Sequence, residues 1–180
     1  MGQLPDVHLE IFEMCDQYLK LVDREMDNLS IDSPRFGAIR TGRRRVKKLH
    51  RYHLLSWAEI ESRGYTVEAS KYDMVEDKIA TAQTAQVILE TALQFYPREP
   101  QLVESAELID EFIASAEISK NIQDAEEASD LKDYSLAVSC YKEALFNLAR
   151  QDDNYKDSKV VAEKINKEIL RLRKLIYKDS

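Results

Sequence analysis

Residues 4–29 read LPDVHLEIFEMCDQYLKLVDREMDNL, and their apolar residues recur at the spacing of an α-helix. One row steps alternately by three and four residues: Leu4, Val7, Ile11, Met14, Tyr18 and Leu21. A second row lies beside it: Phe12, Cys15, Leu19, Val22, Met26 and Leu29. Two adjacent rows make an apolar face wider than a coiled-coil seam, so we expect this helix to pack against two neighbours. The same face would serve homo-oligomerisation, unless other helices of the chain cover it.

The same periodicity predicts five more helices, over about 43–62, 70–96, 100–131, 134–150 and 158–176. The fourth could be one long helix or two with a break near residues 116–120. Residues 30–42 contain Pro34, Gly37 and Gly42 and are typical of a loop. No strand pattern is present. We therefore expect an all-α fold, a helical bundle of about six antiparallel helices.

Local signals set the expected helix ends. Gly64 is a candidate C-cap of the second helix. Ser70, Asp133 and Ser158 are candidate N-caps of the third, fifth and sixth. The inner side of the second helix is expected to carry these residues: Val46, Leu49, His53 and Ile60.

The bulk composition agrees with long helices joined by few turns. The 180 residues include only four Gly and four Pro, and one-third are charged. We expect an N-terminal helical part (1–97) and a C-terminal part (98–180) in one compact unit. Two cysteines, no apolar run long enough to span a membrane and no apparent signal peptide favour a cytoplasmic protein.

Residues 125–149 read AEEASDLKDYSLAVSCYKEALFNLA and predict a close helical hairpin. Small Ala side chains let two helices approach, and Tyr rings fill the groove between them. This pattern resembles a tetratricopeptide hairpin in Ala125, Ala128, Tyr134, Ala137, Tyr141, Ala144 and Leu145, with Lys132 in place of the usual turn glycine. Residues 118–177 also resemble the microtubule-interacting-and-transport (MIT) domain, including its third helix rich in Lys and Arg.

Either resemblance implies a groove that takes a helix or an extended peptide of a protein partner. The partner-binding residues would be Tyr134, Tyr141, Lys164 and Arg171. The alternative is that these side chains only pack.

Residues 35–53, RFGAIRTGRRRVKKLHRYH, hold eight basic residues and no acidic one, in a chain of net charge −7. One explanation is charge balance, which requires the basic side chains to rest on carboxylates such as those of the first helix. A second is weak, non-specific contact with RNA or DNA phosphates through residues 40–53. The candidate phosphate-binding residues are Arg40, Arg43, Arg44, Lys47, Lys48 and Arg51.

A third explanation is catalytic. Arg45, His50 and Tyr52 spell R-x-x-x-x-H-x-Y, which resembles the signature of HEPN ribonucleases. The resemblance implies that His50 exchanges a proton with the ribose 2′-hydroxyl and the leaving oxygen, while Arg45 stabilises the phosphate and Tyr52 orients either group. It requires His50 and Arg45 at the mouth of a shared cleft, across a dimer.

Other chemistry has little support in the sequence. His50 and His53 are three residues apart on a helix, but no third ligand completes a metal site. No glycine-rich phosphate loop is present, and we expect neither metal nor cofactor. We expect a non-enzymatic protein-interaction module, an adaptor or regulator; the alternative is a nucleic-acid-contacting or ribonuclease-like protein that uses residues 40–53.

Overall fold

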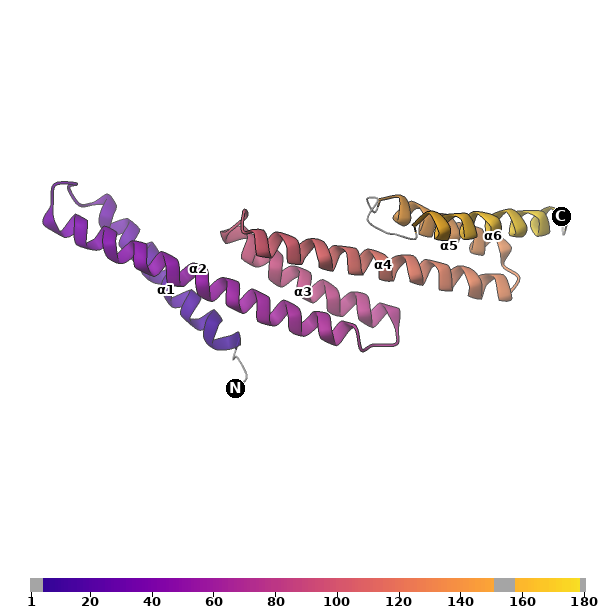
Figure 1. The fold of residues 1–180 in the computed structure, drawn as a ribbon, viewed down its shortest axis with the longest axis horizontal. Coiled ribbons are helices and arrows are strands. Elements are labelled where there is room, and N and C mark those ends of the chain that lie inside the picture. Colours follow the sequence, from indigo (N-terminus) through magenta and orange to yellow (C-terminus); the bar gives the residue numbers. More distant parts are fainter. Residues whose placement is uncertain (1–4, 151–157, 179–180) are drawn as a thin grey trace. The chain divides into compact units, whose positions relative to one another are not determined.

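The computed structural model describes residues 5–150 and 158–178, which form six α-helices with no strand among them (Figure 1). The helices are α1 (Pro5–Asp27), α2 (Pro34–Ala69), α3 (Val75–Phe95), α4 (Pro100–Asp130), α5 (Tyr134–Arg150) and α6 (Ser158–Lys178). The predicted all-α fold is confirmed, and α4 is one continuous helix. Within the described ranges, no helix is long and apolar enough to cross a membrane.

Internal contacts divide the chain into two units. The first unit comprises residues 1–67 and 84–106, and the second comprises residues 68–83 and 107–180. Helices α2, α3 and α4 each contribute residues to both. The predicted parts 1–97 and 98–180, and their folding as one compact unit, stay a prediction.

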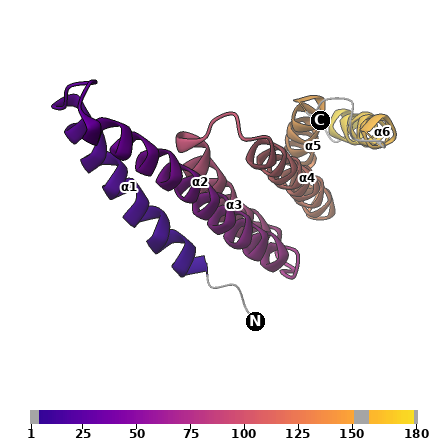
Figure 2. The ribbon, with the colours of Figure 1, turned by 60° about the vertical axis from the view of Figure 1, so that its left-hand side comes forward.

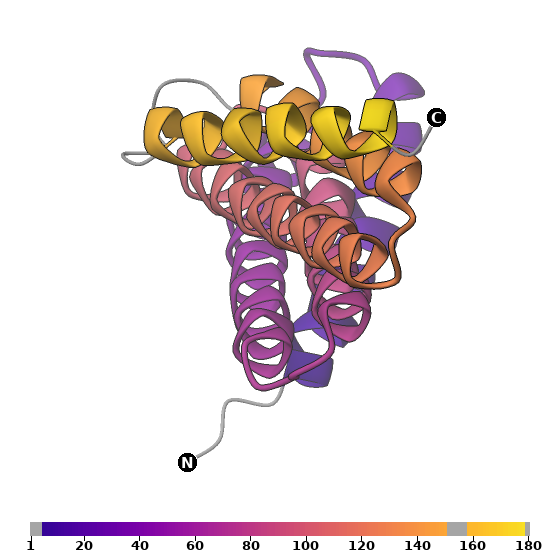
Figure 3. The ribbon, with the colours of Figure 1, turned by 90° about the vertical axis from the view of Figure 1, so that its right-hand side faces the viewer.

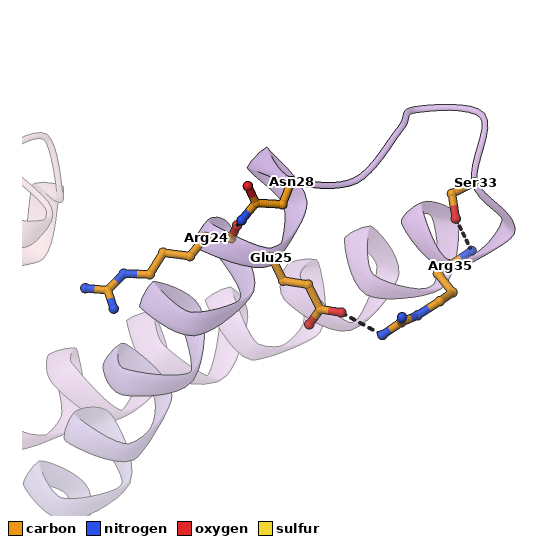
Figure 4. Close-up of polar contacts among 5 residues, drawn as sticks. All are labelled: Arg24, Glu25, Asn28, Ser33 and Arg35. Carbon is orange, nitrogen blue, oxygen red and sulfur yellow. Dashed lines mark hydrogen bonds and ion pairs between the residues drawn. The ribbon is translucent and has the colours of Figure 1, made fainter.

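Helix α2 begins at Pro34, so the prediction of a loop over residues 30–42 is wrong for residues 34–42. Ser33 precedes this start, and its Oγ accepts a hydrogen bond from the Arg35 amide at 3.3 Å (Figure 4). Pro34 then occupies the first helical position, where its missing N–H costs nothing. Gly37 lies inside the helix, as do Gly42 and Gly64, and the predicted C-cap at Gly64 is therefore also wrong.

Helix α1 runs alongside the N-terminal part of α2 in the first unit (Figures 1 and 2). Its contribution to the core comes from the second of its two apolar rows. The buried side chains of this unit include Phe12, Cys15 and Val22 of α1, Leu54 and Ala58 of α2, and Ala85, Leu89 and Ala92 of α3. The alanines of α2 and α3 allow close approach between helices.

The inner face of α2 differs from the prediction. The buried row is His50, Leu54 and Ala58, four residues apart each time, whereas Leu49 is 49 % exposed. The face is thus turned by about one residue, or 100°, from the predicted one. The reason lies in tertiary contacts, because the His50 ring packs against Phe12 with centroids 4.4 Å apart.

The first apolar row of α1 remains largely exposed. We call Val7, Ile11, Met14, Tyr18 and Leu21 the outer row; Leu4 lies outside the described residues. Four of the five are exposed and Ile11 is half-buried. The buried side chains of α1 all belong to the other row, and they contact two neighbours as expected, because the Phe12 ring centroid lies 4.4 Å from that of His50 in α2 and 5.1 Å from that of Phe95 in α3.

The second unit has its own core, to which α4, α5 and α6 contribute (Figure 3). Its buried cluster consists of Ala125, Ala128, Ala137, Val138, Tyr141, Ala144, Ile165, Ile169 and Leu172. Four alanines thus lie where two helices meet closely, as the hairpin pattern predicted. Tyr134 and Leu145 are partly buried against the same cluster.

The turn between α4 and α5 is built from two overlapping caps. Lys132 has a φ of 63°, and its amide bonds Ser129 O at 3.0 Å while the Asp133 amide bonds Ala128 O at 2.9 Å. This pattern is a Schellman C-cap, which usually has glycine at the position of Lys132. Asp133 Oδ1 then accepts from the Leu136 amide at 3.1 Å, which confirms the predicted N-cap of α5.

Candidate functional site

The predicted phosphate-binding residues gather around one groove in the first unit, which we call the basic groove. Its volume is about 430 Å³, and it is lined by Arg40, Arg43, Arg44, Lys47, Lys48, Arg51, Met26 and Tyr96. Six of these eight residues come from α2, because they recur on one side of that helix at spacings of three and four. The groove therefore unites every candidate of the phosphate hypothesis with one thioether and one phenol.

Three basic residues of this segment rest on carboxylates. Arg35 Nη2 bonds Glu25 Oε1 at 2.7 Å outside the groove (Figure 4). Arg43 donates to both oxygens of Asp23, at 2.5 and 3.2 Å. The Arg43 guanidinium lowers the pKa of Asp23, and Asp23 raises the pKa of Arg43 in return. Charge balance with helix α1 thus accounts for part of the basic block.

The third pair joins Arg51 to Glu99, the residue before α4. Arg51 Nε and Nη2 donate to the two carboxylate oxygens of Glu99 at 2.8 and 2.7 Å. The Glu99 side chain is only 9 % exposed, whereas that of Arg51 is 51 % exposed. A buried carboxylate therefore fixes the guanidinium of Arg51 at the edge of the groove.

The remaining basic residues are exposed and have no ion-pair partner within residues 5–150 and 158–178: Arg40, Arg44, Arg45, Lys47 and Lys48. All but Arg45 line the basic groove. Because like charges held close together repel, four cations without an ion pair in one groove favour an anion. Ion pairs within the chain therefore do not account for the positive charge of these four groove residues.

His50 is buried behind the groove and contacts one of its lining residues. It is 5 % exposed, and its Nδ1 lies 2.6 Å from the hydroxyl of Tyr96, a groove residue. Its buried Nε2 has no hydrogen-bond partner, and the nearest carboxylate oxygen, Asp16 Oδ1, is 3.7 Å away. Burial lowers the pKa of His50 while Asp16 raises it less, and the net effect favours the neutral ring. A proton on Nε2, facing Asp16, leaves Nδ1 to accept the hydrogen bond from Tyr96.

The three residues of the ribonuclease signature point in different directions. His50 is buried, whereas Arg45 and Tyr52 are exposed, Tyr52 by 59 %. Their order on the helix separates Arg45 from His50 by about 140° of rotation. Within one chain they do not face a shared cleft, and the catalytic hypothesis gains no support from this geometry.

His53, the other candidate metal ligand, pairs with a histidine of α1. Its Nδ1 lies 3.0 Å from Nδ1 of His8, and burial, then the charge of His8, lowers the pKa of His53. The described part of the chain holds no group of three or more His, Cys, Asp or Glu residues that could bind a metal ion.

A second groove lies in the second unit and has a volume of about 480 Å³. It is lined by Glu126, Ser129, Asp130, Tyr141, Lys164, Lys167, Glu168 and Arg171. Three of the four predicted partner-binding residues are thus brought together, and Tyr134 packs against the core instead. Arg171 Nε donates to Glu168 Oε2 at 2.7 Å. The other basic lining residues, Lys164 and Lys167, share the groove with the carboxylates of Glu126 and Asp130. This groove carries both signs of charge.

Sequence reasoning missed the residues that shape the basic groove from outside α2, in α1 and in the connection between α3 and α4. Met26 and Tyr96 line it, while Asp23 and Glu99 hold two of its arginines. No local pattern marks Glu99 as the partner of an arginine 48 positions away. Comparison with protein-family models, curated proteins and solved structures finds no match to this chain.

Proposed function

We propose that this protein is a non-enzymatic binding module that contacts the phosphate backbone of nucleic acid through the basic groove. The observation that carries the proposal is the lining of that groove, where six basic residues meet and no carboxylate is among the described lining residues. Four of them lack an intramolecular ion pair, so an external anion is the counter-charge that completes the site.

The dimensions fit a short stretch of backbone. From Arg40 to Arg51 the helix rises about 16 Å at 1.5 Å per residue. Four free cations that neutralise phosphates of a single strand predict a slope of about −3 for log K against log salt. Affinity should then fall roughly 50-fold between 50 and 200 mM salt. Such binding reads charge and not base sequence.

The experiment is fluorescence anisotropy with labelled single-stranded RNA and DNA of mixed sequence, at 50, 100 and 200 mM salt. Arg44→Glu reverses a charge in the groove, and Arg45→Glu reverses the adjacent charge outside it. We expect Arg44→Glu to weaken binding at least tenfold more than Arg45→Glu, because only Arg44 loses a contact.

Two outcomes would overturn the proposal. One is no binding of either strand at 50 mM salt. The other is equal loss in Arg44→Glu and Arg45→Glu, which would mean attraction by net charge without a site. Oligoglutamate is titrated in parallel, since binding of this acidic peptide without binding of RNA or DNA assigns the groove to a protein partner.

A second candidate function, an adaptor that binds a protein segment, is supported by the groove in the second unit. Tyr141, Lys164 and Arg171 line it together, opposite carboxylates of α4. A partner segment with both acidic and basic side chains complements such a surface. Affinity purification from the native host tests this: Lys164→Glu should lose a partner that Lys159→Glu, exposed on the same helix but outside the groove, retains.

A further inference from the structure

The outer row of α1 is a continuous apolar stripe on the surface of the first unit. Val7 is 44 % exposed, Met14 68 %, Tyr18 43 % and Leu21 64 %. Together with half-buried Ile11 they recur at intervals of four, three, four and three residues, which is the spacing of a two-stranded helix seam. The stripe runs from residue 7 to residue 21, a rise of about 21 Å along the helix. Exposed apolar patches of this kind mark interaction sites.

The two sides of the stripe differ. On one side lie His8, Cys15 and Val22, of which the last two are buried in the core of the unit. On the other side lie Glu10, Gln17 and Arg24, seven residues apart and all exposed. The Arg24 side chain extends away from its neighbours Glu25 and Asn28 (Figure 4). Neither Glu10 nor Arg24 has an ion-pair partner within the described ranges.

The order of the two charges along the helix, Glu10 before Arg24, is complementary to that of a second copy only if the two helices run antiparallel. If a second α1 runs antiparallel along the stripe, Met14 meets Tyr18, Ile11 meets Leu21, and the two free sides face each other. Glu10 then lies beside Arg24 of the second copy, and symmetry repeats the pair. A parallel copy would instead set the free side of each helix beside the side of His8, Cys15 and Val22 of the other, which offers no opposite charge to Glu10 or Arg24. Opposite charges flanking a seam set the orientation of paired helices.

We propose that the outer row of α1 binds a second copy of this chain, antiparallel and with two-fold symmetry, through two Glu10–Arg24 pairs. The inference is independent of the basic groove. Because the seam is short, the interface is smaller than that of a permanent dimer, and we expect association that depends on concentration.

Sedimentation velocity from 5 to 500 µM tests the association. The wild type should shift from monomer to dimer over this range. Met14→Glu, in the middle of the stripe, should remain monomeric, whereas Leu170→Glu, which replaces a leucine of α6 that is 59 % exposed, should still dimerise. Far-UV circular dichroism of each variant confirms that the helices are retained.

Charge exchange tests the orientation. Glu10→Arg alone places two like-charged arginines across the seam, and Arg24→Glu alone places two glutamates there, so each variant should dimerise at least tenfold more weakly. An equimolar mixture of the two restores both pairs and should dimerise like the wild type. Gln17→Cys should form a disulfide-linked dimer near the symmetry axis, and Glu13→Cys, which lies away from the seam, should not.

Three results would overturn the proposal. They are a monomeric wild type at every concentration, which means that another part of the chain or a different protein covers the stripe; a dimer that survives Met14→Glu; and mixed charge variants that fail to associate. Loss of nucleic-acid binding has no bearing on any of them, since the groove and the outer row share no residue.

Discussion

The ion pair between Arg51 and Glu99 predicts an unequal response to removal of its two partners. Arg51→Met keeps the apolar stem but leaves a carboxylate that is 9 % exposed without its two hydrogen bonds. Breaking a fully buried pair costs about 3–5 kcal/mol. Because the guanidinium side is 51 % exposed, water can reach the site, and we expect a loss of about 2 kcal/mol in the free energy of unfolding.

The opposite change should cost less. Glu99→Met leaves the half-exposed guanidinium of Arg51 in water, which is close to the situation of a surface pair worth about 0–1 kcal/mol. The double variant removes both charges and should be more stable than Arg51→Met alone by roughly 1 kcal/mol or more, since no buried charge remains.

Urea unfolding at pH 7, followed by tryptophan fluorescence, measures these differences. The chain has a single tryptophan, Trp57, which is half-buried on α2 and belongs to the same unit as the ion pair. Equal losses in Arg51→Met and Glu99→Met, or a double variant as unstable as the sum of both, would refute the reasoning that burial of Glu99 sets the cost.

Three further predictions concern pH and backbone conformation. Burial lowers the pKa of His50 below its ordinary 6.5, so that as the pH falls below 6.5 the unfolded chain binds a proton at His50 more readily than the folded chain does. The contribution of neutral His50 to the free energy of unfolding is therefore fully present above pH 6.5, and below pH 6.5 it decreases by up to about 1.4 kcal/mol per pH unit. Urea unfolding at pH 7.0 and 5.5 should show a smaller loss of stability between the two pH values in His50→Gln than in the wild type. Lys132→Gly should raise stability by about 0.5–1 kcal/mol, because glycine adopts a φ of 63° without strain; a lower melting temperature would contradict this. Gly37→Ala should raise it by roughly 0.5–1 kcal/mol in thermal unfolding, since Gly37 lies in the second turn of α2 and an added Cβ meets no atom within 4 Å beyond its chain neighbours and the nearby backbone of its own helix; no change would argue against a helix there.

Apolar periodicity was sufficient to predict six helices and several of their ends. Asp133 was identifiable as an N-cap because a short acidic side chain preceding a periodic segment accepts a backbone hydrogen bond in the first turn. Pro100 and Ser158 were likewise recognised as helix starts. Each of these signals acts through neighbours in sequence, which is why the sequence alone reveals it.

The start of α2 shows where such signals conflict. Pro34 and two glycines within eight residues indicate a loop, yet Ser33 followed by Pro34 is also a helix start. Glycine costs about 1 kcal/mol in a helix interior, and contacts with α1, including Arg43 with Asp23, offset that cost. The Arg43–Asp23 pair joins residues 20 positions apart and is not visible in a local pattern.

The basic residues of the candidate site were predictable from the sequence, whereas the residues that line the groove from outside α2 were not. Helical spacing placed Arg44, Lys47, Lys48 and Arg51 on one face from sequence alone. The ribonuclease resemblance required His50 at the mouth of a cleft, whereas the structure turns it inward onto Tyr96, 46 residues away. A histidine is more polar than Leu49, so a hydropathy pattern chooses the wrong residue as buried. Only the tertiary hydrogen bond and the aromatic neighbours explain the choice.

The turn at Lys132 and Asp133 has a consequence for how the chain tolerates insertions. The amide of Asp133 closes α4 and its carboxylate opens α5, so a single residue fulfils two tasks that most loops divide between several. One glycine inserted after Lys132 would place the C-cap of α4 and the N-cap of α5 on different residues. The direction of α5 relative to α4 would then no longer be fixed by the turn. Natural variation in length should therefore avoid this junction and collect elsewhere in the chain.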